Sequence, residues 1–104
     1  MHIGCFGDRG NDRAIRSLEG NCDMLDGHHQ SRVEAIEKCY QCVLDKNLTF
    51  FALQGGGNCR ADNKGLYAKH GVSSACSGSG KGGAWVNDVY KIISGTPETG
   101  NTFN

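Results

Sequence analysis

Hydrophobic positions recur at helical spacing between residues 31 and 45. They are Val33, Ile36, Tyr40, Val43 and Leu44. Ser31 followed by Glu34 has the spacing of a capping box, which marks the first turn of a helix. The pattern predicts an amphipathic helix from Ser31 to Asp45, with its apolar stripe centred near Ile36 and Tyr40.

Strand-like patterns occur on both sides of this helix. The run LTFFALQ, residues 48–54, has apolar residues on both sides, which predicts a strand covered on both faces. The glycines at 55–57 predict a sharp turn after it. Shorter patterns at 2–6 and 88–93 place the two ends of the chain in one small antiparallel sheet against the helix. Residues 94–104, SGTPETGNTFN, are predicted to form a flexible C-terminal tail.

Composition adds a requirement for covalent support. A core built from 104 residues is marginal on its own, and sixteen glycines favour loops over regular structure. Six cysteines form an even set that is typical of a disulfide framework in an oxidising, extracellular compartment. The expected fold class is α+β: residues 1–93 form a small disulfide-stapled domain with one main helix on a short antiparallel sheet, a PAN/apple- or kringle-like loop-rich module. The cysteines are Cys5, Cys22, Cys39, Cys42, Cys59 and Cys76.

Charge and hydropathy exclude two classes of partner. Eleven basic residues balance eleven acidic residues, so no global field favours nucleic acid. No apolar run has membrane-spanning length, so membrane insertion is not expected. The first ten residues lack a signal-peptide hydrophobic stretch, so a secreted protein would be present here in a mature or excised form. Asn47 begins an Asn-Leu-Thr sequon, a candidate glycosylation site.

Cys39 and Cys42 form a C-x-x-C whose role is open to three interpretations. A redox centre places this motif at a helix N-terminus, whereas two turns of predicted helix precede it here. A zinc site could add His28, His29 and Cys59, but structural zinc sites usually carry a second C-x-x-C or an H-x-x-x-H, which is missing. Helical residues three apart have Cβ atoms roughly 5 to 6 Å apart, too far for a disulfide. We therefore expect each cysteine to bond a different partner, and no metal or cofactor.

Several segments together resemble a known family. They are HIGCF before Asp8, the run Arg13-Ala14-Ile15, two cysteines on one helix, FFALQGGGNC and GGAWVNDVY. In this order and spacing, they resemble a WSC domain, a secreted cysteine-rich module, from about Ile3 to Tyr90.

The resemblance implies a disulfide pairing. In the WSC pattern Cys5 pairs with Cys76, and Cys39 of the helix pairs with Cys59 after the central strand. The chain departs from the family where Arg60-Ala61 replaces a doubled cysteine, which leaves Cys42 with Cys22. It also lacks the late cysteine pair, since SGSGKGGAW keeps the glycines without the thiols.

Enzyme motifs are absent from the sequence. There is no G-x-S-x-G, no H-E-x-x-H and no evident carboxylate pair, and SGSGKGG fails the spacing of a phosphate-binding loop. Asp8, Asn11 and Asp12 offer oxygen ligands to calcium, but without the spacing of a calcium loop, so pairing between Asp and Arg or solvation is expected. The chain is predicted not to be an enzyme.

The WSC resemblance implies carbohydrate binding, since such domains occur in cell-wall sensors and beside carbohydrate-active enzymes. The alternative is an extracellular protein-interaction or adhesion module of a larger receptor or matrix protein. Trp85, the only tryptophan, is either a packing residue or a platform for a sugar ring. Residues 60–81 carry four basic residues and one acidic residue, which favours acidic glycans. The predicted ligand-binding residues are Arg60, Asp62, Asn63, Tyr67, Lys69, His70, Trp85, Asn87 and Asp88.

Overall fold

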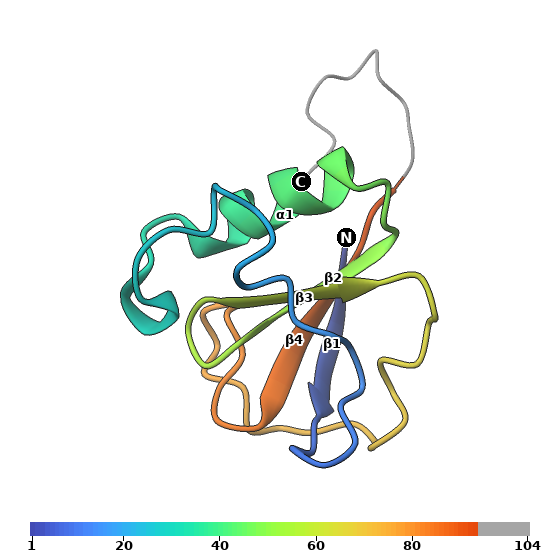
Figure 1. The fold of residues 1–104 in the computed structure, drawn as a ribbon. Coiled ribbons are helices and arrows are strands. Elements are labelled where there is room, and N and C mark those ends of the chain that lie inside the picture. The colour runs from blue at the N-terminus through green and yellow to red at the C-terminus, as the bar shows by residue number, and fades with distance from the viewer. Residues whose placement is uncertain (94–104) are drawn as a thin grey trace.

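The computed structural model describes residues 1–93, so the predicted tail at 94–104 lies outside the described residues. The elements are β1 (His2–Gly7), a short 3-10 helix η1 (His29–Ser31), α1 (Ala35–Asp45), β2 (Phe50–Gln54), β3 (Asn58–Asp62) and β4 (Val86–Lys91). The strands form one antiparallel sheet in the order β1-β4-β2-β3, and α1 packs on one face of it (Figure 1). The predicted α+β class is confirmed.

The helix begins four residues later than predicted, at Ala35. Glu34 has a left-handed backbone with φ of 53° and makes no side-chain capping hydrogen bond, and Ser31 belongs to η1. The predicted capping box of Ser31 and Glu34 is therefore wrong. The reason lies in Arg32, whose extended backbone carries a buried guanidinium that donates to Glu19 and to the carbonyl of Gly57, so residues 32–34 cannot be helical.

The buried face of α1 also differs from the predicted stripe. Its fully buried residues are Ala35, Cys39, Cys42 and Val43, whereas Ile36 and Tyr40 are only partly buried. Val33, expected in the stripe, is 70% exposed, and Leu44 is 39% exposed. The face is centred on the two cysteines because both side chains turn inward to form disulfides.

The predicted cover on both faces of β2 is confirmed. Phe51 and Leu53 pack under α1 with Tyr90, while Ala52 packs on the opposite face in a cluster with Phe6. Loop residues, not a second helix, cover that opposite face. They are Ala14, Ile15 and the half-buried Tyr67.

The sequence pattern missed β3, because NCRAD contains too few apolar residues for a strand signal. The hairpin between β2 and β3 turns at residues 55–57, as the glycines predicted. β3 is buried by loop residues 16–18, which extend the sheet beyond it: Ala61 N donates to Arg16 O, and Leu18 N donates to Cys59 O. The outer edge of β1 is covered in the same way, since Gly7 N donates to Gly71 O and Ser73 N donates to Cys5 O.

All six cysteines are disulfide-bonded, as Cys5–Cys76, Cys22–Cys42 and Cys39–Cys59, with Cα–Cα distances of 6.1, 6.2 and 5.4 Å. The partners are those that the family resemblance implied. Cys39 and Cys42 are bonded to other cysteines, so they do not form a redox pair with each other. They are also not thiolates, so they cannot be zinc ligands. Three disulfides in a domain of this size are typical of extracellular proteins. Over residues 1–93, no helix is long and apolar enough to cross a membrane.

Gly82 occupies the tightest glycine position that packs against the sheet. A Cβ there would overlap the backbone carbonyl of Leu53 and lie 2.7 Å from that of Val86, at a φ of +72°. Gly82→Ala is expected to lower the free energy of unfolding by about 2 kcal/mol, measured by urea unfolding. Gly78→Ala is the matched control, since φ is +92° and no atom lies within 4 Å. Equal losses in the two variants would contradict the steric explanation.

Candidate functional site

Trp85 is an exposed aromatic residue in a strained backbone conformation. It immediately precedes β4, and 54% of its surface is exposed. Its φ is 60°, a region that bulky side chains rarely adopt and that costs of order 1 to 3 kcal/mol. Its carbonyl accepts a hydrogen bond from Asp8 N at 2.9 Å. The fold thus keeps a costly conformation that presents the indole at the surface.

The loop at residues 8–13 supports the indole. The guanidinium carbon of Arg13 lies 5.0 Å from the ring centroid, so the cation covers one face of the ring. Gly10 lies against the edge of the ring, where a Cβ would be 2.9 Å from Trp85 Cη2. The indole is therefore held in place on one face and one edge, while more than half of the residue remains accessible.

A buried ion pair fixes Arg13. The Asp8 carboxylate is fully buried, and its Oδ2 lies 2.9 Å from Arg13 Nε and accepts a hydrogen bond from Gln54 Nε2. Gln54 Oε1 accepts a hydrogen bond from Arg13 at 2.8 Å, and its Nε2 also lies 3.0 Å from Asn87 Oδ1. Burial alone would raise the pKa of Asp8, but hydrogen bonds from Ala14 N and from Gln54 keep that pKa below its ordinary value. The carboxylate stays ionised, which holds the cation beneath the indole.

Asp8 and Asp12, the two carboxylates considered for calcium, each have a basic partner. The expected pairing between Asp and Arg is confirmed for Asp8 and Arg13. Asp12 Oδ1 accepts a hydrogen bond from Lys69 Nζ at 2.8 Å, which lowers the pKa of Asp12. Nowhere in residues 1–93 do three His, Cys, Asp or Glu side chains gather to hold a metal ion.

Two predicted ligand-binding residues lie beside this loop. Lys69 pairs with Asp12, and His70 Nε2 lies 2.6 Å from the carbonyl oxygen of Asp12. The loop at 8–13 thus joins Trp85 to the segment at 66–71. We call Trp85, Gly10, Asp12, Arg13 and Lys69 the tryptophan surface.

Three other predicted residues are buried and serve the fold. Arg60 Nε donates to Ile15 O at 2.8 Å, and burial lowers the pKa of its guanidinium. Asn87 is fully buried. Asp88 accepts hydrogen bonds from Gly82 N and from His2 Nε2, at 2.8 and 2.7 Å. Their side chains are committed to internal partners.

The last three predicted residues lie away from Trp85. Asp62 and Asn63 are at the far end of β3, where Asn63 Oδ1 accepts hydrogen bonds from the backbone and hydroxyl of Thr49. Tyr67 packs edge-on against Phe6, with ring centroids 5.1 Å apart. The nine predicted residues therefore do not converge on one site.

The positive charge expected for residues 60–81 is also reduced. Arg60 is buried with a carbonyl partner, and Lys69 pairs with an aspartate from outside that segment. Lys64 remains exposed and Lys81 is half-buried.

A pocket of about 470 Å³ lies over the Cys5–Cys76 disulfide, between β1 and the glycine-rich loop. Its main polar groups already bind one another: Asp88 accepts from His2, and Tyr90 donates to the carbonyl of Gly80 at 2.7 Å. Burial, together with the charge of Asp88, raises the pKa of Tyr90 to about 12. The Tyr90 ring in this lining is buried, with the residue 6% exposed, whereas Trp85 is 54% exposed.

Sequence reasoning missed Gly10, Arg13 and Gln54 as parts of the surface around Trp85. The available signal was the Asp and Arg pairing in GDRGNDR, which was read only as an alternative to calcium binding. A scan against protein-family models finds no match for this chain, and a search of curated proteins finds no relative. The resemblance to a WSC domain stays a prediction.

Proposed function

We propose that the protein is a secreted carbohydrate-binding module of WSC-like type, and not an enzyme, with the tryptophan surface as its binding site. The observation that carries the proposal is the exposed Trp85, held in a strained conformation over the partly buried ion pair between Arg13 and Asp8. Strain of this kind persists where the surrounding structure maintains it, and it is concentrated at binding sites.

The chemistry of the surface suits a sugar ring. An indole lies against the apolar C–H face of a pyranose, and neighbouring polar groups select among its hydroxyls. Asp12 and Lys69, both partly exposed, supply an acceptor and a donor next to the loop that supports the indole. The Arg13 cation covers the opposite face of the ring, so its role is to fix the ring and not to contact the sugar.

Secretion and glycosylation belong to the same proposal. The disulfide framework fits an oxidising compartment. Asn47 is exposed in the turn between α1 and β2, where a glycan would not disturb the core. Such a chain would be a glycoprotein with lectin-like activity.

A glycan array followed by titration of the best neutral glycan tests the proposal. The fluorescence of the single tryptophan reports binding at Trp85. Trp85→Ala is expected to weaken glycan affinity at least about tenfold, because exposed aromatic anchors dominate such interfaces. Calorimetry measures the variant, which lacks the fluorophore. Val33→Ala, which removes a 70% exposed side chain before α1, is the matched control and should bind normally.

Two outcomes would contradict the proposal. If folded Trp85→Ala keeps full affinity, the glycan binds elsewhere. If the wild-type protein binds no glycan and instead binds an extracellular protein, the adhesion alternative is the better function.

A further inference from the structure

A second pocket, of about 400 Å³, lies at the opposite end of the sheet from Trp85. Asp62, which lines it, pairs with Phe50 at the start of β2, whereas Gln54 at the end of β2 contacts the loop beneath Trp85. We call it the basic pocket. Its lining residues are Arg16, Leu18, Asn21, Lys46, Leu48, Ala61, Asp62, Asn63 and Lys64.

The floor of the basic pocket is apolar. Leu18 and Ala61 belong to the core under α1 and are 2% and 0% exposed, and the half-buried Leu48 packs against that core. The volume lies within the range of small-molecule sites, which run from about 300 to 1,000 Å³.

The rim of the basic pocket is cationic. Arg16, Lys46 and Lys64 are exposed, and none of the three pairs with a carboxylate in the part of the chain that the structure describes. By contrast, each of Arg13, Arg32, Lys38 and Lys69 has such a partner. The one acidic residue of the pocket, Asp62, is buried and accepts a hydrogen bond from the backbone of Lys64. In a chain whose charges balance overall, this rim is locally positive and complements an anion.

Amide groups complete the lining. Asn63 Oδ1 accepts two hydrogen bonds from Thr49, and its Nδ2 donates to no group within residues 1–93. Asn21 is an exposed lining residue whose backbone N donates to Leu18 O at 2.9 Å and whose Nδ2 donates to Glu19 O at 3.4 Å. Donors of this kind suit hydroxyl groups around a ring whose apolar face rests on leucine.

We propose that the basic pocket binds an acidic sugar unit, with its carboxylate at the Arg16 and Lys64 rim and its ring on Leu18 and Leu48. This site is separate from the tryptophan surface. The sequence placed the preference for acidic glycans on residues 60–81. In this proposal that preference moves to a pocket built from residues 16–21 and 46–48 as well as 61–64.

The test uses tetragalacturonic acid and its fully methyl-esterified form, which has the same rings without the charge. Binding is measured by calorimetry and by amide chemical shifts in the wild-type protein and in Arg16→Gln/Lys64→Gln. Arg9→Gln removes an exposed cation from the loop at residues 8–13 and is the matched charge control. Trp85→Ala separates this site from the tryptophan surface.

The acid should bind at least about tenfold more tightly than its ester, with shifts at Leu48 and Ala61. The double variant should lose about tenfold in affinity, since two rim charges are removed, and the loss should shrink in high salt. Arg9→Gln and Trp85→Ala should keep this binding. The proposal is overturned if the acid does not bind, if acid and ester bind equally, or if the double variant binds as the wild type does. The proposal is also overturned if Trp85→Ala loses the binding of the acid while the double variant keeps it, because the acid would then bind at the tryptophan surface.

Discussion

Replacing both Cys5 and Cys76 with alanine is expected to lower the free energy of unfolding by about 4 kcal/mol, the largest loss for any single disulfide here. These cysteines are separated by 71 residues, whereas each of the other two pairs is separated by 20. A longer loop removes more conformational entropy from the unfolded chain, and the same relation gives about 3 kcal/mol for the shorter loops.

The double variant Cys39→Ala/Cys59→Ala provides the comparison. Both of its cysteines are fully buried, whereas Cys5 and Cys76 are only half-buried. An explanation based on packing therefore reverses the order of the two losses. Urea unfolding of both variants measures the two losses in free energy and decides between chain entropy and packing. The dependence of the unfolding free energy on urea concentration shows whether either variant has a more expanded unfolded state.

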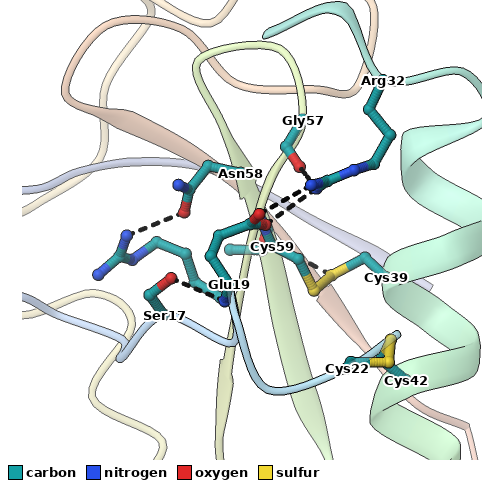
Figure 2. Close-up of a disulfide and its surroundings, with 11 residues drawn as sticks. Ser17, Glu19, Cys22, Arg32, Cys39, Cys42, Gly57, Asn58 and Cys59 are labelled. Carbon is teal, nitrogen blue, oxygen red and sulfur yellow. Dashed lines mark hydrogen bonds and ion pairs between the residues drawn. A yellow bond between two sulfur atoms is a disulfide. The ribbon is translucent and has the colours of Figure 1, made fainter. Parts of the chain in front are cut away.

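Glu19→Ala is expected to cost about 3 kcal/mol, because it removes the carboxylate that is hydrogen-bonded to the buried Arg32 guanidinium. The exposed Asp26, whose Oδ1 lies 4.0 Å from Arg32 Nε, remains near the cation. Figure 2 shows Glu19 between Arg32 and the backbone of Cys59, beside the Cys39–Cys59 disulfide. Its two oxygens lie 2.8 and 2.9 Å from the guanidinium nitrogens, and Oε2 also accepts a hydrogen bond from Cys59 N at 2.8 Å. The Arg32 side chain is 0% exposed, so the carboxylate of Glu19 offsets the cost of burying this cation.

The pH dependence of stability provides an independent measurement on the same residue. Burial alone would raise the pKa of Glu19, but hydrogen bonds from Arg32 and Cys59 N lower it below its ordinary value of 4.5. A depressed pKa in the folded state means that the stabilisation is full above about pH 4.5 and is lost as pH falls through the folded pKa. The gap between wild type and Glu19→Gln should therefore shrink in acid. Glu37→Gln, an exposed position on α1, is the control, and an equal acid response in both variants would contradict this assignment.

The sequence predicted those elements whose own residues contain the signal. The apolar run at Phe51 to Leu53, the glycines after it and the pairing of the two chain ends all follow from local patterns, and each is confirmed. The predicted start of α1 was wrong because Arg32 adopts an extended backbone and its side chain pairs with Glu19. Glu19 lies thirteen residues earlier, so the local pattern contains no sign of this pairing. β3 was missed because its burial comes from distant loop residues around Leu18.

The candidate site was harder to predict for a related reason. Trp85 was identified as a possible platform, but its supports Gly10 and Arg13 come from the other end of the chain. Arg60 and Asp88 have the residue types of a ligand site, yet the fold turns both inward to backbone partners. Residue type alone does not distinguish a charged group that binds a ligand from one that satisfies a buried carbonyl or amide.

The contact between the two ends of the described chain bears on mechanical loading. The Met1 amine donates to the carbonyl of Lys91 at 2.8 Å, and the Lys91 amide donates back to Met1, so the two lie side by side on antiparallel strands. A force that separates these residues peels β1 from β4 one hydrogen bond at a time, which is a weak geometry. Four residues precede Cys5, so this peeling reaches the Cys5–Cys76 disulfide after roughly 15 Å of extension. Everything between those cysteines, including α1, β2, β3 and the other two disulfides, lies outside the path of the force. Under tension the domain would thus extend by a short length at β1 while its larger part stays folded.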